Sequence, residues 1–161
     1  MVKRREEWVA SLTELDASKL VFLDEAGFQD AIHRGRGWAP RGETPTVIAS
    51  YRGKNTTAIG AIRMSGPCAL CAQEGYMNKA DFLWFLENVL GPELREGDVV
   101  VMDNLRSHTS VEARAALARF KATPLFLPPY SPEYNPIEYL WGVMKAWFRK
   151  LPPLKGIEAV L

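Results

Sequence analysis

The chain has little cysteine, no long apolar run and almost no net charge, and each shortage excludes a class of protein. Its two cysteines, Cys68 and Cys71, form a C-x-x-C pair, with no second pair and no histidine cluster to complete a zinc site. Residues three apart in a strand face opposite sides of the sheet, which disfavours binding of one metal ion by both cysteines. We therefore expect two buried small hydrophobes in a reducing compartment.

No apolar stretch has the length of a membrane span, and the first residues lack the apolar segment of a secretory signal. We therefore expect a soluble, cytoplasmic protein.

The formal net charge is only +1, from 20 Lys and Arg against 19 Asp and Glu, so total charge does not indicate a nucleic-acid partner. Binding to nucleic acid would require that basic side chains be grouped. They are partly grouped, since Arg34, Arg36 and Arg41 share a Gly-rich stretch and Arg52 and Lys54 follow it.

The 161 residues, 47% of them hydrophobic, suit a single domain, residues 1–161, without repeats or a low-complexity linker. Apolar periodicity and turn signals predict a mixed sheet with helices packed on its faces. Gly27 is expected in the turn after the first strand, Ser65-Gly66 in a hairpin turn, and Thr109 with Glu112 in a capping box. The predicted helices span residues 4–15, 78–90, 109–120 and 135–150, and the predicted strands span residues 19–24, 56–64, 67–73, 99–102 and 124–127.

Three acidic residues, Asp24, Asp103 and Glu138, stand at positions that indicate a metal-binding catalytic site. Asp24 and Asp103 each end an apolar run, and Glu138 lies just inside a helix that begins at Asn135-Pro136. Short apolar runs that stop at a carboxylate are typical of buried strands that bring an acid to the edge of a sheet. Converging carboxylates need a cation to stay ionised, and oxygen ligands without Cys or His indicate Mg²⁺ or Mn²⁺. Two such ions are the usual means of cutting and joining phosphodiesters, so we expect metal-dependent phosphoryl transfer on nucleic acid.

Each acid also has a structural interpretation. Asp103 precedes Asn104, and the two form a natural turn pair. Asp24 is followed by Glu25, and because successive strand residues face opposite sides, only one of them can join the cluster. We choose Asp24, which directly ends the apolar run.

Glu138 would stand at the third helical position, where a glutamate commonly folds back onto the capping residue. Its own helix face favours a second role. Gly142, Lys145 and Arg149 follow it on that face, which leaves a space one turn on and then a basic track suited to a phosphate backbone. A solvated face would give the same pattern.

Three sequence blocks carry a family resemblance: FLDEAGF at 22–28, MDNLRSH at 102–108 and LPPYSPEYNPIEYLW at 127–141. They resemble the three catalytic blocks of DDE transposases of the mariner superfamily. The 34 residues between the second and third acids, 104–137, are similar to the spacing in members whose third acid is Glu. The segment GRGWAPRG at 35–42 resembles the bacterial insertion-sequence branch, and the resemblance runs from about residue 19 to residue 150.

The resemblance implies an α/β, ribonuclease-H-like fold with a five-stranded mixed sheet and the first Asp on the central strand. It implies that Asp24, Asp103 and Glu138 are the catalytic residues and bind two Mg²⁺ ions, for which Mn²⁺ can substitute. The ions would serve cleavage at transposon ends and then attack by the freed 3′-hydroxyl on target DNA. On this interpretation the residues predicted to contact DNA are Arg36, Trp38, Arg41, Lys54, Asn104, His108, Lys145 and Arg149. His108 and Asn104 could instead support the acids, and His108 could also be an ordinary polar residue at a helix entry.

Family members carry an N-terminal helix-turn-helix region that reads the terminal repeats, and about 18 residues precede the first strand here. We therefore expect this region to be absent and to be supplied by a separate polypeptide. We also expect a homodimer in the DNA complex, no membrane partner and an association with the bacterial nucleoid. Two alternatives remain open: a non-transposing nuclease of the same fold, and an inactive remnant that acts only as a DNA-binding module.

Overall fold

A mixed five-stranded sheet with the strand order β3-β2-β1-β4-β5 forms the centre of the molecule. The structure, a computed structural model, describes residues 2–29, 39–43, 55–129 and 131–150. The central strand β1 (Leu20–Gln29) pairs antiparallel with β2 (Asn55–Arg63) and parallel with β4 (Val99–Met102). On the outside, β3 (Gly66–Glu74) pairs antiparallel with β2, and β5 (Thr123–Phe126) pairs parallel with β4. The predicted sheet is confirmed, and the first of the three acids lies on its central strand.

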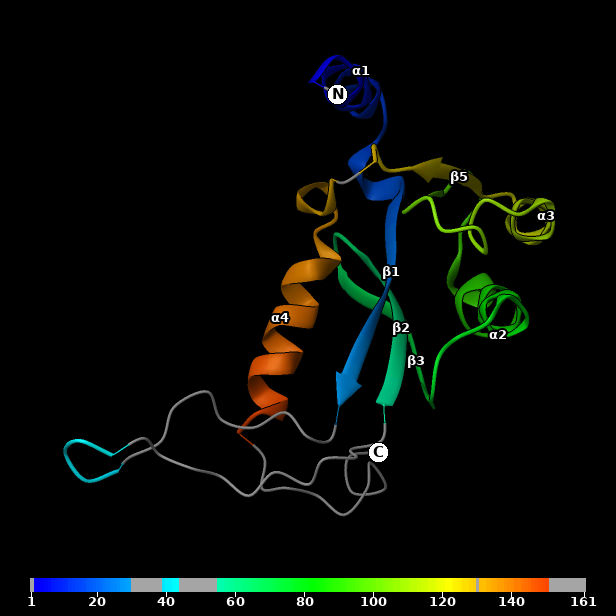
Figure 1. Cartoon of the computed structure of the whole chain (residues 1–161). Coiled ribbons are helices and arrows are strands. Elements are labelled where there is room, and N and C mark those ends of the chain that lie inside the picture. The colour runs from blue at the N-terminus through cyan, green and yellow to red at the C-terminus, as the bar shows by residue number, and fades with distance from the viewer. Residues whose placement is uncertain (1, 30–38, 44–54, 130, 151–161) are drawn as a thin grey trace.

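Helices cover both faces of the sheet (Figure 1). On one face lie α2 (Lys79–Phe85), which continues through a π turn and a 3-10 turn to Glu93, and α3 (Val111–Arg119). On the other face lies α4 (Ile137–Phe148), with α1 (Val2–Thr13) packed at one end of the sheet. No helix in the described part of the chain is long and apolar enough to cross a membrane.

The alternation of side chains along β1 explains how this one strand contributes to two hydrophobic cores, one on each face of the sheet. Val21 and Leu23 are fully buried in the core under α2 and α3. Ala26 and Phe28 point to the opposite face and pack with α4. Because side chains alternate with a period of two, every even-numbered residue of this strand faces α1 or α4. Asp24 therefore belongs to the α4 face and Glu25 to the α2 and α3 face.

The first strand is longer than predicted. It does not end at Asp24 but continues through Gly27 to Gln29, because β2 supplies antiparallel partners from Ile62, opposite Phe22, to Asn55, opposite Gln29. The predicted turn at Gly27 is therefore wrong. The acid stands in the middle of a strand, at the position where the parallel neighbour β4 has already ended.

Local signals predicted each helix, and the observed starts of α1, α3 and α4 differ from the predicted ones by one or two residues. Asn78 caps α2 in a full capping box with Asp81, as the sequence pattern indicates. At α3 the cap is Ser110, not Thr109, since the Ser110 hydroxyl accepts from the Ala113 amide. The hairpin turn falls at residues 64–65, and Gly66, with φ of 116°, already pairs in β3.

Cys68 and Cys71 both lie in β3. They are free and half-buried rather than fully buried.

Candidate active site

Asp24, Asp103 and Glu138 line one cavity of about 530 Å³. The parallel pairing of β1 and β4 brings the two aspartates together, because Phe22 is opposite Val101 and each aspartate stands two residues further on. Glu138 reaches the same cavity from the first turn of α4. The remaining lining comes from the residues after β4 and from the proline-rich segment: Asn104, Leu105, Leu127, Pro128, Pro129, Ser131, Pro132 and Asn135.

Asp24 is held on the α4 face by Trp141, whose indole Nε1 donates to Asp24 Oδ2 over 3.2 Å. Trp141 is 1% exposed and lies against Gly60, the residue paired with Asp24 across β1 and β2. A Cβ at Gly60 would come within 3.0 Å of the indole ring, so glycine makes room for this contact. Burial, together with the negative charges of Glu138 and Asp103, raises the pKa of Asp24 to about 6. The site therefore disfavours the negative charge of Asp24.

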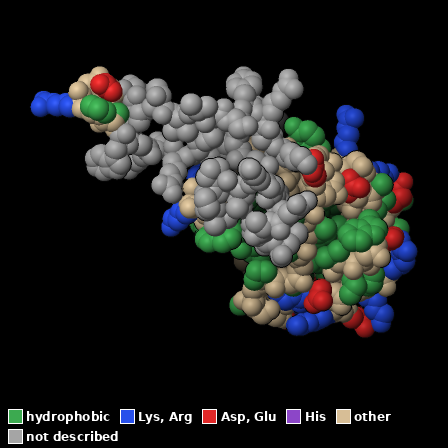
Figure 2. Space-filling view, turned by 90° about the horizontal axis from the view of Figure 1, so that it is seen from below, with side chains coloured by type: hydrophobic (Ala, Val, Ile, Leu, Met, Phe, Trp, Pro, Cys, Tyr) green, Lys and Arg blue, Asp and Glu red, His purple; other side chains and the backbone are tan. Residues whose placement is uncertain are grey.

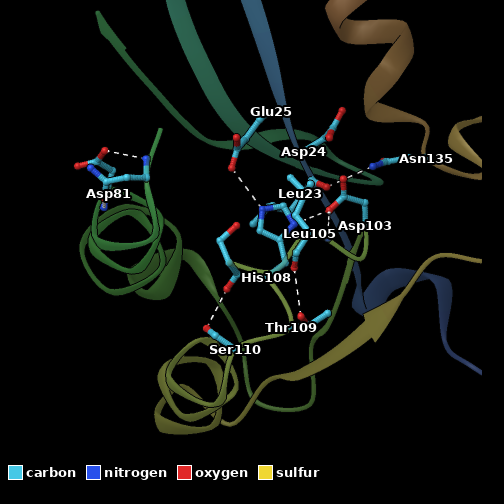
Figure 3. A network of polar contacts seen from close by, with 12 residues as sticks. Leu23, Asp24, Glu25, Asp81, Asp103, Leu105, His108, Thr109, Ser110 and Asn135 are labelled. Carbon is cyan, nitrogen blue, oxygen red and sulfur yellow. Dashed lines mark hydrogen bonds and ion pairs between the residues drawn. The ribbon is translucent and has the colours of Figure 1, made fainter. Parts of the chain in front are cut away.

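Glu25 points to the opposite face of β1 and meets His108 (Figure 3). His108 Nε2 lies 3.2 Å from Glu25 Oε1, and Nδ1 lies 2.6 Å from Asp103 Oδ1. The contact between Nδ1 and Asp103 is a close ion pair, but its angles do not meet the geometry of a hydrogen bond. Burial opposes protonation of the ring, but its contacts with the two carboxylates outweigh burial and raise the pKa of His108 to about 9. Burial likewise opposes ionisation of Asp103, but contact with His108 and a hydrogen bond from the Leu105 amide hold the pKa of Asp103 below its usual range.

Glu138 is not used as a helix cap. The backbone N–H of Asn135, which a capping glutamate would bind, donates instead to Pro132 O over 2.9 Å. The Asn135 side chain binds the start of the helix instead, since its Oδ1 accepts from the Ile137 amide at 3.3 Å. Its Nδ2 donates to Leu23 O at 3.2 Å, which ties the start of α4 to β1 beside Asp24. The Glu138 side chain is thereby left at the cavity.

The three acids offer the oxygen donors that Mg²⁺ and Mn²⁺ prefer. Within the described residues, however, no three His, Cys, Asp or Glu side chains are already close enough to form a finished ligand set. Repulsion between ionised carboxylates opposes their closer approach when no cation compensates it. The donor chemistry fits a divalent ion, and the ligands are gathered around the cavity rather than assembled at one point.

The residues predicted to contact DNA are placed in different ways. Arg36, Trp38 and Lys54 lie outside the described residues. Arg41 is exposed, in a turn at 39–43 that stands apart from the sheet (Figure 1).

The other candidates lie on the domain itself. Asn104 is exposed at the cavity and donates from Nδ2 to Leu127 O at 2.6 Å. Lys145 is half-buried, with its ammonium 5.9 Å from the centre of the Phe28 ring, and Arg149 is exposed at the end of α4. His108 is only 1% exposed, so the prediction that it contacts DNA directly is wrong. Its ring lies behind Asp103 instead.

Three residues that organise the site were not among the predicted site residues: Glu25, Asn135 and Trp141. Glu25 was set aside because it faces away from Asp24, which is correct, but its own face carries His108. Asn135 and Trp141 lie at the start of and within the predicted last helix, and their contacts with β1 depend on tertiary packing.

Comparison with known proteins identifies the family. The sequence matches the family described as DDE superfamily endonuclease over residues 19–160. The chain belongs to this family. It is 25% identical over 168 residues to the transposable element Tc1 transposase of Caenorhabditis elegans, an alignment that covers 96% of this chain and 56% of that protein. The chain thus spans about half the length of the curated relative that it matches.

Solved structures show the same fold. The Mos1 transposase paired-end complex with left transposon end gives a TM-score of 0.80 at 22% identity, over 98% of this chain and 51% of that chain. The Mos1 mariner paired-end complex with Mn gives a TM-score of 0.77 at 22% identity, over 96% of this chain and 49% of that chain. The catalytic domain of Mos1 mariner transposase gives a TM-score of 0.72 at 19% identity, over 98% of this chain and 75% of that chain. The predicted ribonuclease-H-like fold and the predicted relation to the mariner transposases are confirmed.

Proposed function

We propose that this chain is the catalytic domain of a transposase that cleaves DNA at transposon ends and joins the freed 3′-hydroxyl to target DNA. The observation that best supports the proposal is the convergence of Asp24, Asp103 and Glu138 on one cavity. They come from three separate sequence blocks and from β1, the end of β4 and α4. Membership of the DDE superfamily endonucleases and the likeness to the Tc1 transposase support it independently.

In this proposal the three acids are catalytic and hold two Mg²⁺ or Mn²⁺ ions. When bound, such ions supply the activation of the attacking oxygen and the stabilisation of the leaving oxygen. The chain's own residues prepare the ligands: Trp141 orients Asp24, the Leu105 amide and His108 hold one oxygen of Asp103, and Asn135 fixes the start of the helix that carries Glu138. The raised pKa of Asp24 supports the need for a cation among these charges. Mos1 structures named for Mn and for Mg are consistent with this choice of metal.

The proposed partner is DNA, both transposon ends and target, bound in a homodimeric complex. Basic, acidic and apolar side chains are interspersed on the face of the molecule seen in Figure 2, and the net charge is only +1, so we expect attraction to phosphates to come from local groups rather than a field of one sign. We assign contacts with DNA to Arg36, Trp38, Arg41 and Lys54 beyond the first acid, to Asn104 at the cavity, and to Lys145 and Arg149 along α4. A helix-turn-helix polypeptide supplies recognition of the ends. The segment at 35–42 favours the bacterial insertion-sequence branch and hence action at the nucleoid.

A strand-transfer assay tests the proposal. The protein, with a helix-turn-helix domain supplied in trans or fused, is incubated with Mn²⁺, a duplex carrying the inverted repeats that flank its gene, and a target plasmid. We expect cleavage at the repeat ends and covalent joining to the plasmid, both lost in Asp103→Asn. Metal-dependent cutting of unrelated duplexes or RNA hybrids without joining would instead identify a nuclease. DNA binding without any cleavage would identify an inactive remnant.

A further inference from the structure

His108 is clamped between two carboxylates that come from different strands. Its Nε2 meets Glu25 on β1, and its Nδ1 meets Asp103 just beyond β4 (Figure 3). Its ring also packs on Phe82 of α2, with ring centroids 4.2 Å apart. The His108 side chain is 0% exposed and the Glu25 side chain 20% exposed, whereas 41% of the Asp103 side chain is exposed. The chain of contacts therefore passes through the buried His108 ring and ends at the most exposed of the three side chains, Asp103 in the cavity.

The loop that carries His108 is fixed by its own hydrogen bonds. The Leu105 amide donates to Asp103 Oδ1 at 3.0 Å, and the Thr109 hydroxyl donates to Leu105 O at 3.2 Å. The His108 ring and the Leu105 amide thus share one oxygen of Asp103, Oδ1. Within the described part of the chain, Oδ2 of Asp103 takes no hydrogen bond. Oδ1 of Asp103 is therefore held by the protein, and Oδ2 is available to bind a metal ion.

We propose that Glu25 and His108 are positioning residues, which hold the Asp103 carboxylate by Oδ1 so that Oδ2 is presented to a divalent ion. This inference rests on the proposed function, since it takes Asp103 as a metal ligand. Residues hydrogen-bonded to ligands typically change metal affinity by about 10–100-fold when they are replaced. Glu25 acts only through the imidazole and contacts neither DNA nor metal.

Calorimetric titration of Mn²⁺ into the purified chain tests the proposal without any turnover. Two substitutions at His108 separate its two contacts, because the amide nitrogen of asparagine falls near Nδ1 and that of glutamine near Nε2. We expect His108→Gln, which loses the Asp103 contact, to bind Mn²⁺ roughly 10–100-fold more weakly than wild type. His108→Asn, which keeps that contact, should bind more tightly than His108→Gln. Glu25→Gln removes the distant charge and should weaken binding by about tenfold.

Glu112→Gln is the matched control, because it also removes one carboxylate charge, from an exposed ion pair with Lys79 whose residues do not line the cavity. It should bind Mn²⁺ as wild type does. Unchanged affinity in Glu25→Gln and in both His108 variants, with Asp103→Asn weakened, would overturn this inference and leave the proposed function intact. Unchanged affinity in Asp103→Asn itself would overturn both.

NMR gives a second test that requires no substitution at Glu25, Asp103 or His108. The chain has two histidines, and His33 can be removed as His33→Asn to leave one set of imidazole signals. Addition of Mg²⁺ should shift the His108 ring signals in the NMR spectrum, because the ion binds the carboxylate that the ring holds. Ring signals that stay in place at saturating Mg²⁺ would contradict the proposal.

Discussion

The indole nitrogen of Trp141 donates to a carboxylate oxygen of Asp24, 117 positions earlier in the chain, over 3.2 Å. The contact joins the helix that carries the third acid to the strand that carries the first. It also gives a buried tryptophan nitrogen the partner that such a nitrogen usually requires. Together with the hydrogen bond from Asn135 to Leu23 O, it holds the first and third blocks of the family side by side.

Replacement of Trp141 by phenylalanine should lower the free energy of unfolding by about 1–3 kcal/mol. The variant loses a hydrogen bond to a charged group and leaves space in a core where the tryptophan is 1% exposed. Urea denaturation measures the change. Trp147→Phe on the same helix is the control, since Trp147 is 53% exposed and should change stability by no more than about 0.5 kcal/mol. Equal effects of the two substitutions would show that the contact with Asp24 does not stabilise the fold.

Divalent metal should raise the melting temperature, and the rise should depend on pH. A ligand that binds only the folded state stabilises it by about 2.7 kcal/mol at one hundred times its Kd. Because the pKa of Asp24 is raised to about 6, the metal must displace a proton at pH 5 but not at pH 7.5. We expect the shift with millimolar Mn²⁺ to be larger at pH 7.5 in a thermal melt, and to be smaller in Asp103→Asn. Identical shifts at the two pH values would contradict the assignment of Asp24 as a ligand.

Glu138→Gln and Glu138→Ala separate a capping role from a catalytic one. Since the Asn135 amide is already bonded to Pro132 O, loss of the Glu138 carboxylate should cost less than about 0.5 kcal/mol of stability in either variant. Both variants should lose nearly all DNA cleavage, because neither keeps the charge that a divalent ion requires. A capping glutamate would behave in the opposite way, with cleavage retained in Glu138→Gln and about 1 kcal/mol of stability lost in Glu138→Ala.

The metal-free fold should lose stability in alkaline solution through His108. Its folded pKa, about 9, lies above the ordinary value of 6.5, so the protonated ring stabilises the fold fully below about pH 6.5. That contribution is lost as the pH rises from 6.5 through 9. Denaturant midpoints measured across this window should fall in wild type and remain flatter in His108→Asn. A parallel decline in the two proteins would assign the loss to other groups.

The basic track along α4 should contribute to DNA binding through phosphate contacts. Lys145→Gln with Arg149→Gln should weaken affinity for any duplex and reduce the slope of log affinity against log salt by about 0.9 per lost contact. Lys121→Gln, an exposed cation paired with Glu96 on another part of the surface, is the control and should leave the slope unchanged. An unchanged slope in the double variant would mean that this helix face is simply solvated.

Local sequence patterns determined the parts of this molecule that are built within a few residues. The apolar runs defined four of the strands to within one or two positions, and Asn78 with Asp81 fixed the start of α2. Strand alternation implies that only one of Asp24 and Glu25 can face the cavity, and the end of the apolar run favours Asp24. These signals succeed because periodicity and capping act between residues at most one helical turn or one strand pair apart.

Tertiary structure decided what joins those parts. β1 extends past Asp24 only because β2 lies beside it, and Asn135 contacts β1 only because α4 packs across that strand. The clamp on His108 joins residues 83 positions apart in the chain. No local pattern encodes such contacts, because they depend on how separate strands and helices pack around a common core. The sequence therefore identified the three acids, and the packing of the elements determined the side chains that hold them.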